Sequence, residues 1–349
     1  MTVGGQKAPV EDARPLRLTL AVAAPRVAPR DIERFLASQS AAGLGAADEV
    51  SIAASPATGS DARDFDRWLE LGASISPGPS SAALRFTLHA CETTPMRLWG
   101  HAMARARGSH VAVLDARDTL APGWVRAWAE AAEASGDAIC FGPVDPGQLS
   151  DSCSWAAYLS EYGRFWSPLA ADDTAELPGN NIVFPRDSLP ADETLESQGF
   201  WKTFHLVTLR DDHGGGDSLA LAPCPGMVVR VERRYRLTEY LRRRYLHGRC
   251  YGGRRLEQPG APPRLLCLGF TPLLPAVRTA RVLRRVAKRL ELLWAQPDPQ
   301  ADPPAGSLPA RRGWPAAAFA PLVLGEIAWS WGEFNGYARG AGSACEELW

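Results

Sequence analysis

Short apolar runs alternate with segments of helical spacing along most of the chain, and this alternation constrains the fold more than any other feature. The expected strands cover residues 16–24, 48–55, 110–115, 138–144, 180–189 and 222–231. The expected helices between them cover residues 31–41, 64–72, 95–108, 124–135 and 199–212. Repeated strand-helix-strand order predicts an α/β fold, in which flanking helices cover a mainly parallel sheet.

Length and charge limit the domain organisation and the kinds of partner. The chain has 349 residues, 46% of them hydrophobic, and a formal net charge of -1. This length suits one large α/β domain with an appendage, and the small charge gives no overall bias toward nucleic acid. We expect a disordered leader at 1–15, a sheet domain at 16–228 and a helical, basic and apolar appendage at 229–349. A Pro-rich linker is expected at 297–313.

The cysteines and the apolar segments bear on the compartment. The seven cysteines are scattered, with no CxxC pair and no metal-ligand spacing. Their odd number predicts reduced thiols in a cytosolic protein. No segment reaches about 18 uninterrupted apolar residues. The nearest, 265–275 and 315–331, leave a peripheral membrane contact as an alternative.

The most informative short segment is HVAVLDARDTLAPGW, residues 110–124. Asp115, Arg117 and Asp118 directly follow an apolar strand and precede a turn at Pro122. The two aspartates could cap the helix that begins near Pro122. They could equally form part of a ligand site, because sheets of this kind bind ligands at the carboxyl ends of their strands. Arg117 could pair with these aspartates or contact a phosphate, for which its guanidinium geometry is suited.

This segment resembles family 2 glycosyltransferases of the GT-A fold, which run A-x-G, a hydrophobic strand, L-D-x-D-D and a P-x-W/L turn. The matching residues are Ala106, Gly108, Leu114, Asp115, Asp118, Pro122 and Trp124. Residues 233–252 and the tail WSWGEFNGYARGAG resemble later segments of bacterial members. The resemblance covers roughly residues 16–255 and implies a GT-A sheet of the nucleotide-diphospho-sugar transferase type.

The resemblance also implies chemistry. Members transfer a sugar from a nucleotide-sugar donor, and by resemblance the transfer would invert the anomeric centre. Asp115 and Asp118 would hold Mg²⁺ or Mn²⁺ against the diphosphate of the donor. Arg117 stands where the family has the second metal-facing carboxylate, so a divalent ion would lose a ligand and gain a repulsive neighbour.

Two further family positions differ. Ala54 and Ser55 replace the Asp-Asp-Gly-Ser segment that reads the nucleotide, although they should still border the donor site. Gly199-Phe200 replaces the Glu-Asp pair that supplies the base for the acceptor hydroxyl, and neither residue can accept a proton. Glu193 and Glu196 are then the bases by default, provided that the helix start is shifted.

Two charged segments lie outside these motifs. DDHGGGD at 211–217 contains His213, and we expect an exposed glycine-rich loop there rather than a metal site. The arginines of 230–255 form either a solvated face or a contact with phospholipid head groups or a lipid-linked acceptor. No nucleic-acid motif accompanies them. They are Arg230, Arg233, Arg234, Arg236, Arg242, Arg243, Arg244, Arg249, Arg254 and Arg255.

The favoured function is sugar transfer from an activated donor to a cell-envelope or secondary-metabolite acceptor, a glycan or a lipid-linked compound. The expected location is the cytoplasm, with a peripheral position at the inner face of the cell membrane as an alternative. The main rival is a catalytically inactive homologue that binds and supports an active enzyme, and the loss of acidic residues at three motif positions is what this rival predicts. A membrane-bound scaffold is the third alternative.

Overall fold

The computed structural model describes residues 17–27, 29–45, 47–56, 70, 83–89, 94–169, 176–212, 220–258, 260–295 and 316–348. Several sequence predictions lie outside these residues. They are the leader at 1–15, the helix at 64–72 apart from residue 70, the loop around His213, and the linker at 297–313.

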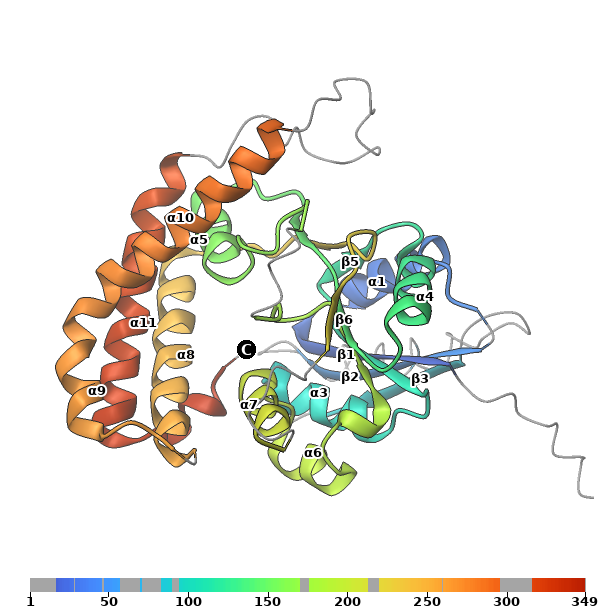
Figure 1. Ribbon diagram of the computed structural model, residues 1–349, viewed down its shortest axis with the longest axis horizontal. Helices are drawn as coiled ribbons and strands as arrows, with labels where there is room; N and C mark the ends of the chain where they lie inside the picture. The colour runs from blue at the N-terminus through green and yellow to red at the C-terminus, as the bar shows by residue number, and fades with distance from the viewer. Residues whose placement is uncertain are drawn as a thin grey trace, which may run out of the picture.

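A mixed, mainly parallel sheet forms the centre of the first region (Figure 1). Its order is β3-β2-β1-β4-β8-β6-β9 among the described residues, and only β8 runs antiparallel to its neighbours there. The bounds are β1 (Leu18–Val27), β2 (Asp48–Pro56), β3 (Ala83–Leu88), β4 (His110–Asp115), β6 (Ile139–Phe141), β8 (Ile182–Pro185) and β9 (Leu221–Pro223). The predicted fold class is therefore confirmed.

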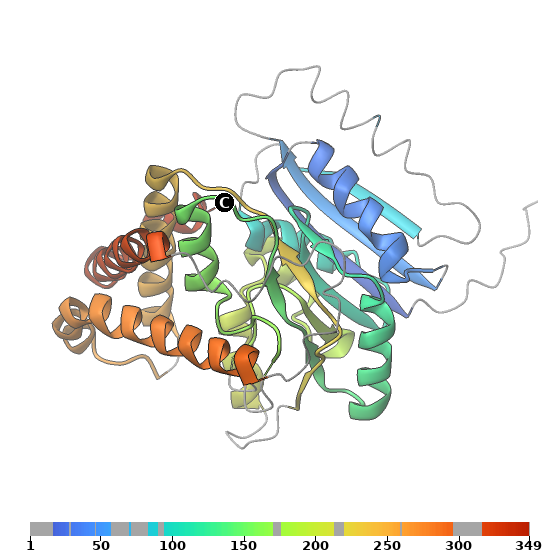
Figure 2. The same cartoon turned by 90° about the horizontal axis from the view of Figure 1, so that it is seen from above.

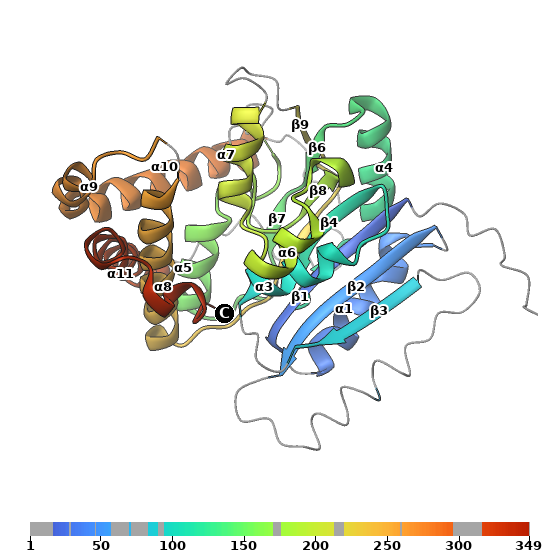
Figure 3. The same ribbon diagram turned by 90° about the horizontal axis from the view of Figure 1, so that it is seen from below.

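Helices cover both faces of this sheet (Figure 3). α1 (Pro29–Ala42) and α4 (Trp124–Ser135) lie on one face, where Trp124 and Trp128 enter the core. The other face carries α3 (Pro95–Ala104), α6 (Asp192–Gln198) and α7 (Lys202–Asp212), and the short η2 (Arg186–Ser188) precedes α6. The side chain of Thr94 accepts a hydrogen bond from the N–H of Arg97 and so caps α3.

A second, small sheet brings the segment after β4 beside a later part of the chain. Its order is β5 (Asp118–Leu120), β10 (Val229–Val231) and β7 (Val144–Pro146), and Asp118 pairs with Val231. Because β10 still pairs with strands of the first region, the domain boundary expected after residue 228 falls too early. The helical appendage begins at Leu237, where α8 starts.

The appendage is a layer of long helices at one side of the sheet region (Figures 1 and 2). It contains α8 (Leu237–Glu257), α9 (Arg264–Phe270), η3 (Thr271–Leu273), α10 (Leu274–Ala295), η5 (Ala316–Ala318), α11 (Phe319–Arg339) and η6 (Gly342–Cys345). α5 (Ser152–Glu161) lies between these helices and the sheet. A Cβ on Gly248 would meet the carbonyl oxygen of Trp329 at 2.0 Å, so glycine allows α8 and α11 to pack closely.

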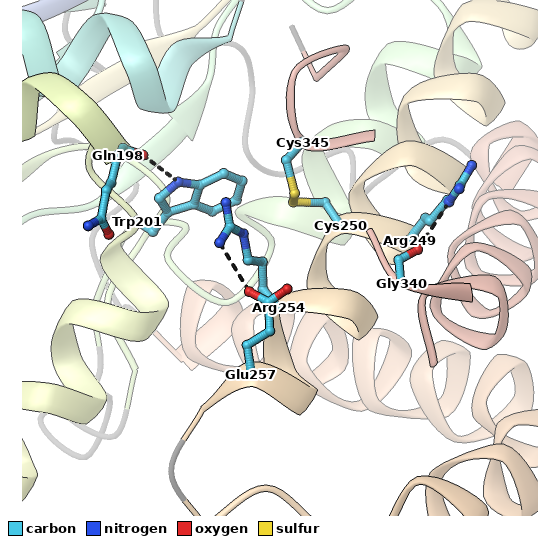
Figure 4. The surroundings of a disulfide bond; sticks show 8 residues. All are labelled: Gln198, Trp201, Arg249, Cys250, Arg254, Glu257, Gly340 and Cys345. Carbon is cyan, nitrogen blue, oxygen red and sulfur yellow. Dashed lines mark hydrogen bonds and ion pairs between the residues drawn. A yellow bond between two sulfur atoms is a disulfide. The ribbon is translucent and has the colours of Figure 1, made fainter. Parts of the chain in front are cut away.

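A disulfide bond joins Cys250 of α8 to Cys345 of η6, with a Cα–Cα distance of 5.0 Å (Figure 4). The prediction that all cysteines are reduced thiols is wrong for this pair, because the fold brings together two residues that lie 95 positions apart. Cys140, Cys153, Cys224 and Cys267 are free, and Cys91 is outside the described residues. Beside the bond, Leu246 and Leu348 pack with Trp201 and tie the tail to the sheet region.

Candidate functional site

The centre of the site is the turn that follows β4. Asp115 is buried, and its Oδ1 accepts hydrogen bonds from the backbone N–H and the Nε of Arg117, both at 2.9 Å. Its Oδ2 lies 2.6 Å from the Nη2 of Arg117. The arginine therefore folds back onto the aspartate at the end of its own strand, and its side chain is only 16% exposed.

Arg233 contacts both aspartates and so completes a cluster of four charged side chains, Asp115, Arg117, Asp118 and Arg233. It lies two residues beyond β10, and its Nε and Nη2 donate to the two carboxylate oxygens of Asp118 at 3.2 and 2.7 Å. The same Nη2 lies 3.3 Å from Oδ2 of Asp115. The side-chain amide of Asn180 also donates to Asp118. Both carboxylates are thus bound by guanidinium groups.

The electrostatics of the two aspartates differ. Burial alone would raise the pKa of Asp115, but the positive charges of Arg117 and Arg233 outweigh it and lower that pKa well below its usual range. Burial raises the pKa of Asp118 to about 6, and Arg233 opposes the shift. At neutral pH both aspartates are mainly ionised, and the two arginines balance their charge.

A divalent metal does not fit this cluster as it stands. A hard cation needs free carboxylate oxygens, and the oxygens of Asp115 and Asp118 already accept from Arg117, Arg233 and Asn180. In the described part of the chain, no group of three or more His, Cys, Asp or Glu side chains could hold a metal ion. The positive charge beside the aspartates is supplied by guanidinium groups.

A cavity of about 280 Å³ opens beside Asp115 and Arg117, between the sheet region and the appendage. The end of α5 and the segment after it form one wall, and α8, α10 and α11 form the opposite wall. The basic residues that line it are Arg117, Arg164, Lys202, Arg233, Arg243, Arg244, Arg278 and Arg285.

This cavity carries an excess of positive charge. Five carboxylates pair with its eight basic side chains: Asp115, Asp118, Glu161, Glu176 and Glu326. Three positive charges therefore remain unbalanced among the described residues. Burial lowers the pKa of Lys202 to about 8, and its Nζ donates to the carbonyl oxygens of Leu177 and Pro178. An anion would relieve this repulsion.

Two hydrogen-bond donors in the cavity wall also favour the binding of an anion. The Nε atoms of Arg243 and Arg244 are buried and have no hydrogen-bond partner among the described residues. Arg244 and Arg278 also stack on Trp329, with their guanidinium carbons 4.5 and 4.4 Å from the ring centroid. The ring of His247 lies 4.4 Å from the same tryptophan. The wall is thus cationic and has more hydrogen-bond donors than acceptors to pair with them.

Ala54 and Ser55 lie at the same edge of the sheet as this site but outside the cavity. Ala54 pairs with Ala24 of β1, and Asp115 pairs with Ala23, so Ala54, Ser55 and Asp115 lie at the same edge of the sheet. However, β1 separates β2 from β4, and neither Ala54 nor Ser55 lines the cavity. Ala54 and Ser55 were expected to border the donor site, and they lie at the same edge of the sheet as Asp115 but two strands away from it.

The two glutamates expected to act as the base for the acceptor hydroxyl do not line the cavity. Glu193 and Glu196 lie exposed on α6, and Glu196 pairs with Arg105 at 3.4 Å. The position that the resemblance assigns to the base does reach the cavity wall, but Phe200 occupies it and packs against Phe184. α6 begins at Asp192, so its start does not turn either glutamate inward.

Sequence reasoning missed several residues of the cavity. Arg233 was recognised only as one of a run of arginines, and Asn180, Glu161 and Lys202 lay outside every motif.

Six arginines of 230–255 are engaged in ion pairs, which leaves less of their charge for a lipid surface. They are Arg233, Arg242, Arg243, Arg244, Arg254 and Arg255.

A larger depression of about 1020 Å³ lies at the opposite edge of the sheet, near Pro185 and Ile139. Pro185 pairs with His110 at the start of β4, so this depression is far from the carboxyl ends of the parallel strands. The smaller cavity is the better candidate site, because ligands of such sheets bind at those carboxyl ends.

Comparisons with known proteins give similarity in fold only. No family model matches the chain, and no curated protein matches its sequence. Among solved structures, S. aureus TarS 1-349 is 10% identical with a TM-score of 0.41, and the match covers 80% of this chain and 83% of that chain. The mannosyltransferase PcManGT from Pyrobaculum calidifontis, in complex with GDP-Man and Mn²⁺, is 18% identical with a TM-score of 0.44, covering 96% and 89%. TarS 1-349 in complex with UDP is 11% identical with a TM-score of 0.39, covering 89% and 90%.

Proposed function

We propose that this chain is a glycosyltransferase-like protein that binds the diphosphate of a nucleotide sugar in the cavity beside Asp115 and transfers the sugar to an acceptor. The observation that carries the proposal is the pairing of Asp115 and Asp118 with Arg117 and Arg233 at the edge of a cavity where, among the described residues, eight basic side chains face five carboxylates. In the family that the sequence resembles, a divalent metal supplies this positive charge. Here the arginines supply it.

The transfer would be a direct displacement. An acceptor oxygen bonds to the anomeric carbon while the bond from that carbon to the diphosphate oxygen breaks. The departing diphosphate carries the negative charge, and the guanidinium groups of the cavity stabilise it with paired hydrogen bonds. The acceptor would be a glycan or a lipid-linked compound of the cell envelope, or a secondary metabolite.

The acceptor hydroxyl also needs a group that takes its proton, and we assign this role to Glu161 in place of Glu193 or Glu196. Glu161 lines the cavity and pairs with Arg243 at 3.3 Å. Burial alone would raise its pKa, but the charges of Arg243 and Arg233 lower it. A carboxylate with a lowered pKa is a weak base, so turnover should be slow.

Calorimetry with UDP and GDP tests the binding step, using wild type, Arg117→Ala and Arg278→Ala, each with Mn²⁺ and with EDTA. We expect wild-type binding to persist in EDTA and to weaken in both variants by roughly tenfold or more, as expected for a lost charged hydrogen bond. Arg126→Ala is the matched control, because Arg126 is exposed on α4 and does not line the cavity. Binding that requires Mn²⁺ would refute the substitution of arginines for metal.

A catalytically inactive homologue is the second candidate, and one observation favours it: Phe200 fills the base position. Release of nucleoside diphosphate from nucleotide sugars, with and without glycan acceptors, separates the two functions. Release that falls in Glu161→Gln supports the transferase. Tight nucleotide binding without any release supports the inactive homologue.

A further inference from the structure

The outward side of α9, η3 and the first half of α10 is apolar and exposed. Leu265 is 82% exposed, Phe270 57% and Leu273 60%, and Leu266 and Val277 are about half exposed. Leu266, Phe270, Leu273 and Val277 follow one another at helical spacing, so they share one side of the helical run. Monomeric soluble proteins rarely leave such a contiguous apolar stripe uncovered.

The opposite side of the same run is firmly attached to the protein. Val282 and Val286 of α10 are buried. Arg278 pairs with Glu326 at 2.7 Å, Arg285 pairs with Glu176 at 3.2 Å, and Arg289 donates to the carbonyl oxygen of Arg164 at 2.8 Å. The exposed stripe is therefore held in place by a docked helix.

By length and hydropathy alone this run, Arg264–Leu292, could cross a membrane; its most apolar window has a mean hydropathy of 1.2 and is 11% buried. Spanning would require the ion pairs of Arg278 and Arg285 to break and leave buried charges unpaired, which is costly. A position on the surface of a membrane keeps every one of these contacts. The geometry therefore favours a helix that lies on the membrane over one that crosses it.

The basic residues of α10 continue the same stripe. Arg281 and Arg284 are exposed and follow Val277 at spacings of four and three residues, and Lys288 is exposed four residues later. An apolar stripe with basic residues at one end is typical of helices that lie in the interface of an anionic bilayer. The apolar side chains enter the interface, and the arginines contact the lipid phosphates.

We infer that this surface, formed by Leu265, Leu266, Phe270, Leu273, Val277, Arg281 and Arg284, binds an anionic phospholipid bilayer. The inference rests on the appendage alone and is independent of the proposed function. The inward side of α10 supplies Arg278 and Arg285 to the cavity, so the thickness of one helix would separate the lipid from the candidate site. Figure 1 shows α9 on the side of the molecule away from the sheet, where a flat membrane could reach it.

Co-flotation of the full chain with vesicles tests the inference. Vesicles of phosphatidylcholine alone are compared with vesicles that contain phosphatidylglycerol, at low and high salt. We expect binding to the anionic vesicles that weakens as salt rises. Leu266→Gln/Phe270→Gln should reduce the partition coefficient by about tenfold or more, because two large apolar side chains leave the interface. Arg281→Ala/Arg284→Ala should reduce it by about fivefold per arginine at low salt.

Two controls keep the test specific. All substituted side chains are exposed, so circular dichroism and the melting temperature should match wild type. Arg126→Ala, on α4 of the sheet region, should bind as wild type does. Absence of vesicle binding, or equal binding by the apolar double variant, overturns the inference. So does a dimer of wild type in solution that the apolar double variant abolishes, because the stripe would then be covered by a second copy of the chain.

Discussion

Removal of Arg233 tests whether the cluster at the end of β4 is a true charge network. In Arg233→Ala, Asp118 loses both of its guanidinium hydrogen bonds, at 3.2 and 2.7 Å, and keeps only the amide of Asn180. Asp115 keeps Arg117. The substitution therefore leaves one carboxylate, 1% exposed, without a counter-charge.

The expected loss is large and depends on pH. Breaking a buried ion pair from one side costs about 3–5 kcal/mol of unfolding free energy, because the remaining charge stays buried. The pKa of Asp118 is already raised to about 6 by burial, and loss of Arg233 removes a charge that lowers it, so it rises further. An aspartate with a raised folded-state pKa binds a proton more readily in the folded than in the unfolded state. Stability relative to wild type should therefore recover as pH falls below the new pKa, by up to about 1.4 kcal/mol per pH unit, until Asp118 of wild type also binds a proton near its pKa of about 6.

Urea denaturation at pH 8 and pH 5 measures this, with Asp118→Asn and the double variant Arg233→Ala/Asp118→Asn completing a double-mutant cycle. We expect the double variant to be more stable than Arg233→Ala at pH 8, because no unpaired charge remains. A loss below about 1 kcal/mol for Arg233→Ala, or a loss that does not change with pH, would show that Arg233 is not the counter-charge of Asp118.

Two further predictions concern the appendage. Thiol titration in denaturant should detect five free cysteines without reductant and seven after reduction, because Cys250 and Cys345 are joined; detection of seven in the unreduced protein contradicts the bond. Burial lowers the pKa of His247 to about 3, so this imidazole binds a proton near pH 6.5 in the unfolded chain but stays neutral there in the folded chain. Stability should fall as pH drops from 7 to 4, less steeply in His247→Gln, and an imidazole that titrates near pH 6.5 by NMR refutes this.

The strand-helix alternation was sufficient to predict the fold class, because apolar runs and turn residues are local signals. It could not give the direction of β8, which the chain reverses relative to β4, or the place of β1 between β2 and β4. Both depend on contacts between distant residues. The expected strand at 222–231 is two strands in different sheets, interrupted at Cys224–Val228, because its apolar residues continue through the turn between them.

The sequence located the centre of the site but not its wall. Asp115, Arg117 and Asp118 follow a strand that periodicity identifies, so their place at the sheet edge was predictable. Glu161 and Lys202 reach the cavity from α5 and α7, and nothing in their own neighbourhood signals this. Glu193 and Glu196 were assigned by elimination, and α6 directs both to solvent.

Arg117 and Arg233 together can replace the charge of the divalent cation that the family motif holds beside its two carboxylates. A divalent cation held by two carboxylates has no net charge, and Asp115 and Asp118 with Arg117 and Arg233 likewise have none at neutral pH. An arginine at position 117 alone would leave Asp118 buried without a counter-charge, because Asn180 is neutral, so Arg233 is needed to complete the replacement. Because guanidinium groups stay protonated at any working pH, such a cluster keeps this balance of charge when metal is scarce. Four of the eight basic side chains that line the cavity, Arg243, Arg244, Arg278 and Arg285, are on α8 and α10, so anion binding depends on the docking of the appendage.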